Sequence, residues 1–265
     1  MSLITDLREM GAEVLSSREL LYEMTKRDLL LRYKQTVMGF AWAVFMPLLN
    51  TAVFSVIFMR VAPLDVGAPY PLFAFCGLLV WYFFASTQKF ALTSLTSNTN
   101  LVTKVYFPRE VFPVSAALVC LVDFAVASLV LVGLMIYYQT PVTGALVFLP
   151  AVVAVHLMFT VGVALFVSMA NLFYRDVKYI FDIVLTVGMF ATSVLYPPHL
   201  VKGTLATVMR LNPMTPIIDA YRDVLIFGRF PEVTPFLIAV GFSALTLALG
   251  WLLFHRAEFE FAENV

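Results

Sequence analysis

The chain has 265 residues, of which 61% are hydrophobic and 13% are charged, whereas soluble domains average about 45–50% apolar and about 25% charged residues. This composition, with a mean hydropathy of +0.90, excludes a soluble globular domain and a disordered chain. The 17 basic and 17 acidic residues cancel, so no net positive field attracts nucleic acid, and we expect no nucleic-acid partner. The chain is therefore predicted to be an all-α membrane protein.

Six apolar stretches are long enough to cross a membrane, because a span needs about 20 apolar residues to cover a hydrocarbon core of about 30 Å. They cover residues 37–59, 70–92, 111–138, 145–174, 179–197 and 233–254. Residues 1–36 and 255–265 flank this six-span domain. Twelve of the 17 Lys and Arg residues lie in segments that are cytoplasmic if both termini are, and this bias predicts an N-in, C-in topology.

The segment before the first span is predicted to form an amphipathic helix. Ser16 and Glu19 have the spacing of a capping box, which marks a helix start. Leucines on one side of this helix and basic residues on the other favour a helix that lies on the inner leaflet. A solvated helix that leads into the first span is the alternative.

A second short helix is expected between the second and third spans. Asn98 can cap this helix, and Pro108 ends it because a proline disfavours helix at the residue before it. Leu101, Val102 and Val105 give the helix an apolar side, which suits docking to another protein. The alternative is a helix folded back on the membrane.

Residues 198–232 form a long segment on the outer side, and long segments without structure are uncommon. Residues 204–211 and 215–227 each have helical spacing, and a turn signal at 212–213 separates them. Two short helices that dip into the membrane would make a re-entrant hairpin, which needs protein or a water-filled cavity around its backbone. A small extracellular cap is the alternative.

Two aspartates lie within the predicted spans, where charged groups are costly and are functional candidates by default. Asp182 is close in sequence to Arg175 and Lys178, which favours a structural ion pair. Asp123 lies nearer mid-depth, where it either faces a cavity or makes a buried, hydrogen-bonded helix contact. Two scattered aspartates are a poor ion-coupling cluster.

An aromatic run in the second span, Trp81, Tyr82, Phe83 and Phe84, is placed at mid-depth or below. Packing within protein and lipid is the ordinary explanation for such rings. Aromatic faces also suit sliding contact with sugar rings, because they offer contact area without a fixed hydrogen-bond register.

Nucleotide-binding and catalytic motifs are missing from the sequence. GxxxxGK[ST], HExxH and GxSxG do not occur, and no cysteine pair has metal-ligand spacing. We therefore expect no catalytic residue, no metal ligand and no cofactor bound by this chain. Energy for active transport would have to come from a partner.

Several motifs together resemble a known family. They are RDL at 27–29, RYKQT at 32–36, GFAW at 39–42, NLVTKVYFPREV at 100–111, YRDV at 174–177 and NPMTP at 212–216. In their order and spacing they are similar to the ABC-2-type permeases that export lipid-linked polysaccharides, which include O-antigen, capsule and teichoic-acid exporters. The resemblance covers nearly the whole chain.

This resemblance implies a homodimer of six-span subunits in the bacterial inner membrane. Two copies of a separate ATP-binding subunit, which carry ATP and Mg, would drive it. The implied substrate is a polysaccharide linked to undecaprenyl pyrophosphate, such as O-antigen.

The resemblance also implies roles for particular segments and residues. The helix before the first span, over residues 17–35, would be the interface helix. The helix after the second span would be a coupling helix seated in the ATPase, with Asn98, Leu101, Val102, Lys104, Val105, Tyr106, Arg109 and Glu110 as its contact residues. The glycan path would be lined by Trp81, Tyr82, Phe84 and Asp123. Pyrophosphate would first meet Arg27, Arg32 and Lys34, since basic side chains suit phosphate.

Other transporter classes remain open at this point. The nearest alternatives are related exporters of teichoic acid, capsule, drugs or other small molecules. A secondary transporter or a channel would also be built from six apolar spans, but such proteins usually show an ion-coupling cluster or a filter within the spans.

Overall fold

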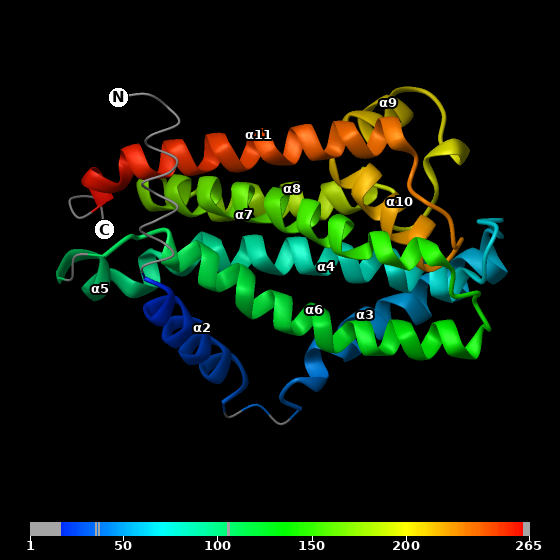
Figure 1. The fold of residues 1–265 in the computed structure, drawn as a ribbon, viewed down its shortest axis with the longest axis horizontal. Coiled ribbons are helices and arrows are strands. Elements are labelled where there is room, and N and C mark those ends of the chain that lie inside the picture. The colour runs from blue at the N-terminus through cyan, green and yellow to red at the C-terminus, as the bar shows by residue number, and fades with distance from the viewer. Residues whose placement is uncertain (1–16, 35, 37, 105–106, 262–265) are drawn as a thin grey trace.

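The computed structural model describes residues 17–34, 36, 38–104 and 107–261, and these residues form helices with no strand among them (Figure 1). The helices are α2 (Arg18–Tyr33), α3 (Ala41–Val56), α4 (Tyr70–Ser94), α5 (Thr99–Lys104), α6 (Val111–Tyr137), α7 (Leu149–Phe173), α8 (Val177–Phe190), α9 (Thr204–Leu211), α10 (Met214–Leu225) and α11 (Val233–Ala257). A π-helical turn, Ile57–Val61, extends α3. The all-helical fold class is confirmed.

Five helical segments are long and apolar enough to cross a membrane: Ala41–Val61, Tyr70–Ser94, Val111–Tyr137, Gly144–Phe173 and Val233–Ala257. They coincide with five of the six predicted spans. The remaining prediction, 179–197, corresponds to α8, which has only 14 residues and ends at Phe190. Fourteen residues rise about 21 Å, which is less than the hydrocarbon thickness of about 30 Å.

The chain leaves the helix after α8 because polar side chains bind its carbonyl groups. Asn212 Nδ2 donates to the carbonyl of Ala191 at 3.3 Å, and Arg222 Nη2 donates to that of Val194 at 2.6 Å. Arg222 Nη1 also donates to the carbonyl of Ser193. Irregular backbone among apolar helices is tolerated where such groups satisfy it, so hydropathy alone overestimated the length of this helix.

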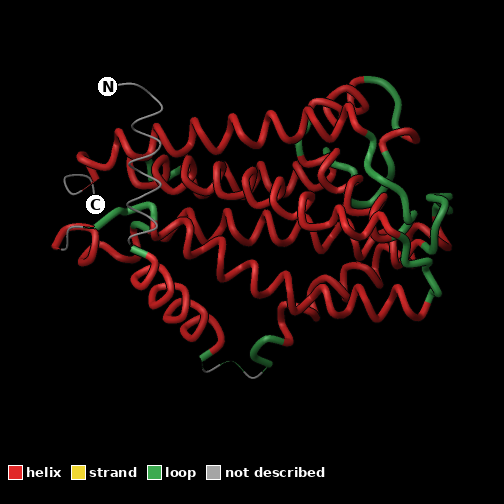
Figure 2. Tube along the Cα trace, in the orientation of Figure 1, coloured by secondary structure: helices red, strands yellow, loops and turns green. Residues whose placement is uncertain are grey.

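Helix α4 is the centre of the bundle. Of its most apolar 18-residue window, 83% is buried, against 11% of the corresponding window in α3. Helices α6 and α7 pack along α4, and α3, α8 and α10 also contact it. Figure 2 shows these long helices running side by side. Side chains of α4 therefore contribute to whatever cavity the bundle encloses.

Helices α7 and α11 pack closely at a pair of glycines. A Cβ atom on Gly162 would lie 2.6 Å from the backbone nitrogen of Leu247, and one on Gly250 would meet the carbonyl oxygen of Gly162. Small residues allow helix backbones to approach in this way. Neither α7 nor α11, each described over its whole length, contributes a lining residue to the two cavities presented below.

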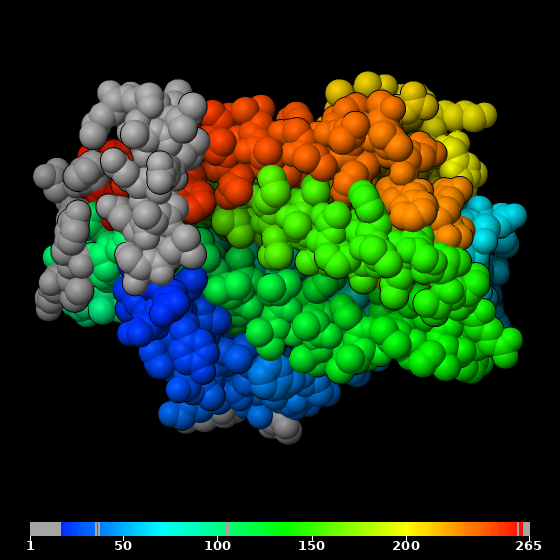
Figure 3. Space-filling view, in the orientation of Figure 1, coloured from blue at the N-terminus to red at the C-terminus, as the bar shows by residue number. Residues whose placement is uncertain are grey.

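One end of the molecule, called here the α5 end, gathers α2, α5 and the last turn of α11 (Figure 1). Met24, Val102, Phe112, Phe254 and Phe261 pack there in one apolar cluster. Helix α2 begins at Arg18 and carries no side-chain cap from Ser17; Ser16 of the predicted capping box lies outside the described residues. Figure 3 shows α2 and α3, in blue, at the edge of the visible face.

The opposite end, called the α10 end, carries the two short helices predicted for residues 204–211 and 215–227. They form α9 and α10 within two residues of the predicted bounds. In α10, nine of 12 residues are buried, whereas α9 buries only Met209 among its residues, all of which are described. Helix α10 therefore belongs to the core, and α9 lies on its surface.

Candidate functional site

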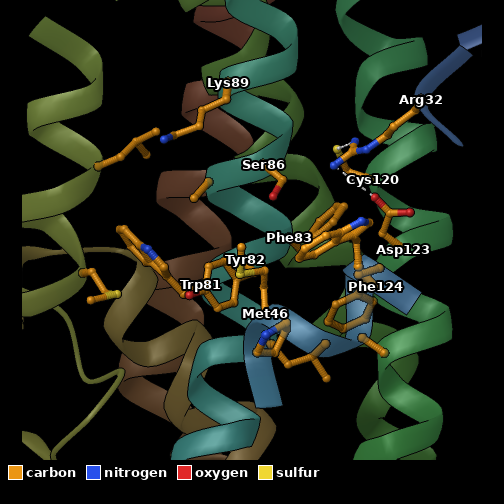
Figure 4. A pocket seen from close by; sticks show the side chains of 18 of the residues that line it. Arg32, Met46, Trp81, Tyr82, Phe83, Ser86, Lys89, Cys120, Asp123 and Phe124 are labelled. Atoms are coloured by element: carbon orange, nitrogen blue, oxygen red, sulfur yellow. Dashed lines mark hydrogen bonds and ion pairs between the residues drawn. The ribbon is translucent and has the colours of Figure 1, made fainter. Parts of the chain in front are cut away.

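A cavity of about 550 Å³ lies between α2, α3, α4, α6 and α8. Trp81, Tyr82 and Asp123, three of the four residues predicted for the glycan path, line it together with Arg32, which was predicted to meet pyrophosphate. Figure 4 shows Trp81 and Tyr82 on one side of this space and Asp123 with Arg32 on the other. The tertiary structure thus brings two separately predicted groups of residues to one cavity.

The aromatic wall of this cavity comes mainly from α4. Asn50 Nδ2 of α3 donates a hydrogen bond to the Tyr82 hydroxyl at 2.7 Å, which fixes the orientation of that ring. Trp81 lies against α8, where a Cβ atom on Gly188 would be 3.1 Å from Trp81 Cη2. Phe84 is placed behind the wall: it is buried and stacks on Phe159, with ring centroids 5.5 Å apart.

Asp123 lines this cavity and also makes hydrogen-bonded contacts between helices. The two predicted environments, a cavity and a helix contact, are therefore not exclusive. Its Oδ2 atom lies 3.2 Å from Arg32 Nη2, and its Oδ1 atom accepts a hydrogen bond from the Tyr33 hydroxyl. Arg32 Nη1 lies 3.3 Å from Cys120 Sγ. Burial and the bond to Asp123 raise the pKa of Tyr33, so its hydroxyl remains protonated as the donor.

A second cavity, of about 660 Å³, adjoins the first toward the α5 end. The two share Arg32, Ser86 and Lys89, and the second continues to Arg27 and Asn98. The two cavities, which share these lining residues, are together called the passage here; Arg27 and Lys89 line it toward the α5 end, and Trp81 and Tyr82 line the first cavity.

The basic residues predicted to meet pyrophosphate are placed differently. Arg27 lines the second cavity and donates hydrogen bonds to Asp28 at 2.7 Å and to Asn98 Oδ1 at 3.0 Å. Arg32 lines both cavities. Lys34 is exposed to solvent and is among the lining residues of neither cavity.

Lys89 is a lining residue that the sequence analysis missed. It is the single charged residue within the apolar stretch 70–92, and that isolation is the signal that points to it. Its Nζ atom lies 3.0 Å from Asp182 Oδ1. The structural ion pair expected for Asp182 therefore exists, but its partner is Lys89 on α4 and not Arg175 or Lys178, because this face of α8 packs toward α4.

The predicted coupling helix is α5, which has six residues. Val102 is fully buried in the apolar cluster of the α5 end, and Leu101 is half-buried beside that cluster. Asn98 precedes α5 and donates to the carbonyl of Ser94 at 2.8 Å. Val105 and Tyr106 lie outside the described residues, as does the side chain of Lys104.

Arg109 and Glu110 bind within the chain. The Arg109 amide donates to Glu258 Oε1 at 3.1 Å, and its guanidinium donates to the carbonyls of Glu258 and Val102 at 2.6 and 3.1 Å. Glu110 is buried, with Oε1 3.2 Å from His255 Nδ1. These contacts join α5 to the last turn of α11.

Among the described residues, three side chains of this cluster are close enough together to be considered as ligands of a metal ion. Single ligand atoms of Glu110, His255 and Glu258 lie within 4.8 Å of one another. The guanidinium of Arg109 lies 3.8 Å from Glu258 Oε1 and already supplies positive charge there. Burial and the charge of Glu110 raise the pKa of Glu258.

Comparison with known proteins gives one consistent result. Residues 19–226 match the ABC-2 type transporter family. An O-antigen export system permease protein, RfbA, of Myxococcus xanthus is 31% identical over 96% of this chain and 98% of its own length. RfbA of Klebsiella pneumoniae is 28% identical over 92% and 94%, and the polysialic acid transport protein KpsM of Escherichia coli is 21% identical over 88% and 91%. The motifs, the five apolar helices and these matches agree: the chain belongs to the ABC-2 type transporter family.

Proposed function

We propose that the chain is the transmembrane permease of an ATP-driven exporter that moves a lipid-linked polysaccharide of the O-antigen type across the bacterial inner membrane. Two relatives that are 28–31% identical over more than nine-tenths of the chain bear the name of O-antigen export permease. The five apolar helices fit a membrane location.

The observation that carries this proposal is the passage formed by the two cavities. Guanidinium and ammonium groups suit a diphosphate, and Arg27, Arg32 and Lys89 line its α5 end. Aromatic faces suit sugar rings, and Trp81 and Tyr82 line its deeper part. A glycan attached to a lipid through a diphosphate carries both chemical groups in that order.

The lipid chain of such a substrate needs an apolar surface beside the passage. Helices α3 and α8 flank the first cavity, and their outward side chains are exposed and apolar; they include Leu49, Val53, Ile183 and Val187. The same two faces suit a second copy of the chain in a homodimer. In this arrangement α8 and residues 191–197 make the sixth crossing, both termini are cytoplasmic, and α9 with α10 forms a re-entrant hairpin on the outer side.

The driving subunit is a separate ATP-binding protein, in two copies per dimer, which carries ATP and Mg. Helix α5 provides its docking element, since Val102 anchors this short helix in the apolar cluster while neighbouring residues such as Thr99 and Thr103 are exposed. Arg109 then links the docking element to α11 through Glu258. The chain supplies the passage and the link, and the partner supplies hydrolysis.

Deletion of the gene in the source bacterium, followed by complementation, tests this proposal. We expect the deletion to remove the surface polysaccharide and to leave lipid-linked glycan at the inner face, and the wild-type chain to restore export and to co-purify with an ATP-binding subunit. A Trp81→Ala, Tyr82→Ala variant should be present at normal levels and export less. Unchanged surface polysaccharide in the deletion strain, or altered drug accumulation alone, would contradict the proposal.

A further inference from the structure

The cations of the passage differ in how their charges are balanced. Arg27 pairs with its chain neighbour Asp28, at 2.7 Å. Arg32 pairs with Asp123, whose side chain is only 13% exposed. Lys89 pairs with Asp182, and both side chains are more than half exposed, at 59% and 56%. Exposed ion pairs are weak, so the counter-ion of Lys89 is the easiest of the three to displace.

Lys89 also occupies the junction of the passage. It lines both cavities, whereas Asp182 is not among the described lining residues of either. Figure 4 shows Lys89 on the same helix as Trp81 and nearer the α5 end. Lys89 shares this place with Arg32 and Ser86, which also line both cavities. An anionic group that reaches Lys89 there competes with the Asp182 carboxylate.

Helix α8, which carries Asp182, is held by few contacts. Leu185 is the one buried residue of this helix, all of which is described. It also contacts α4 through the Trp81 ring against Gly188 and through the Lys89–Asp182 pair, and its Phe181 and Met189 side chains pack partly buried against the core. Loss of the ion pair therefore removes one of the few contacts that hold α8 on the side of the cavity.

We infer that Lys89 binds the diphosphate headgroup of the lipid-linked substrate and that Asp182 occupies this ammonium group only while the passage is empty. Binding of the diphosphate exchanges the carboxylate for a phosphate oxygen, and it thereby frees the Asp182 end of α8. This inference rests on the proposed function, from which it takes the lipid-linked diphosphate.

The test uses the full chain in phosphatidylcholine nanodiscs and farnesyl diphosphate as the probe, with farnesol and inorganic pyrophosphate as comparison ligands. The Lys89→Ala variant loses a charge-assisted hydrogen bond to the diphosphate, so its affinity for farnesyl diphosphate should be about tenfold lower than that of the wild type. Lys89→Arg should bind as the wild type does. Asp182→Asn removes the competing carboxylate and should tighten binding about threefold. Lys178→Ala, which removes an exposed lysine of α8 that lines neither cavity, is the matched control and should have no effect.

Hydrogen–deuterium exchange of residues 177–190 reports the second half of the inference. Farnesyl diphosphate should accelerate exchange of this segment in the wild type, and the segment should already exchange faster in ligand-free Asp182→Asn. A charge swap, Lys89→Asp with Asp182→Lys, restores the ion pair but not the cation that lines the cavities. It should show slow exchange of α8 and weak binding.

The outcomes separate this inference from the proposed function. Wild-type affinity in Lys89→Ala or in the charge swap, with farnesyl diphosphate still preferred over farnesol, overturns the role of Lys89 and leaves the diphosphate-linked substrate in place. Equal affinity for farnesol and farnesyl diphosphate in the wild type contradicts both. If inorganic pyrophosphate binds as tightly as farnesyl diphosphate, Lys89 remains an anion-binding residue, but the conclusion that its ligand is a lipid headgroup is overturned. Exchange of α8 that does not respond to Asp182→Asn overturns the release of the helix.

Discussion

The two ends of α4 hold cations in opposite ways. At the α10 end, Arg222 is 2% exposed, donates to the carbonyls of Ser193, Val194 and Phe73, and lies 3.5 Å above the Phe73 ring. Toward the α5 end, Lys89 has a single exposed carboxylate partner at the junction of two cavities. Arg222 has several fixed backbone acceptors besides the Asp219 carboxylate, which lies 3.4 Å from its Nη1 atom, whereas Lys89 has one carboxylate acceptor.

This difference shows how the same kind of charge serves two purposes in one bundle. Backbone carbonyls cannot leave Arg222 without unfolding the irregular segment after α8, so this contact fixes structure. A carboxylate side chain on a loosely packed helix can leave Lys89 at little cost, so that contact suits an exchange of ligands. Burial and the mobility of the acceptor, more than the charge itself, distinguish a structural cation from a binding one.

The largest effect is expected when the fixed contact is broken. Arg222→Met should leave buried carbonyl groups of the segment after α8 without donors and should lower the free energy of unfolding by about 3 kcal/mol or more. Thermal unfolding of the detergent-solubilised chain measures this change. Arg210→Met, which removes an exposed arginine of α9, should change it by less than about 1 kcal/mol; equal losses in the two variants would show that burial does not make this difference.

A pair of glycine substitutions sharpens the comparison. In Gly77→Ala the new Cβ atom would meet Arg222 Nη2 and the carbonyl of Val194, neither of which can move freely, and we expect a loss of about 2 kcal/mol from overpacking. In Gly188→Ala the Cβ atom would lie 3.1 Å from Trp81, where the loosely held α8 can shift, and the loss should be below about 1 kcal/mol. Denaturant unfolding of both variants checks the ranking, and a larger loss in Gly188→Ala would mean that α8 is held firmly.

Substitution of Arg109 should have an effect on stability between those expected for a fully buried and a fully exposed arginine, because the Arg109 side chain is 14% exposed. Arg109→Ala removes its bonds to Val102 and Glu258 and should lower the free energy of unfolding by about 1–2 kcal/mol. If the network transmits motion from α5 to α11, the variant should still bind the ATP-binding subunit but export less glycan per ATP hydrolysed. The ratio of export to hydrolysis in proteoliposomes, with Arg256→Ala as the control, measures this. Loss of the partner with an unchanged ratio would instead place Arg109 in the docking surface.

Sequence patterns predicted the long helices closely for a simple physical reason. A membrane-spanning helix needs an apolar stretch of a fixed length, and such stretches are visible without knowledge of packing. The prediction for residues 179–197 shows the limit of this reasoning. Hydropathy does not register that Arg222 and Asn212, from a distant part of the chain, bind the carbonyl groups of residues 191, 193 and 194 where the helix ends.

The candidate site was predictable in its chemistry and not in its geometry. Trp81, Tyr82, Asp123 and Arg32 drew notice as aromatic, acidic or basic residues in unusual places, and the fold brings them to one cavity. The inward direction of Arg109 and the burial of Phe84 depend on which neighbours pack against them, so no local pattern reveals them.

The sequence by itself determined an all-α membrane protein, its apolar helices, its short helices at both ends and its family, because these depend on composition, periodicity and local motifs. Only the tertiary structure decided that α4 is the central helix, that Lys89 pairs with Asp182, and that two cavities meet between Arg32 and Lys89. These features arise from contacts between residues that are far apart in the chain, and such contacts are fixed by the packing of whole helices.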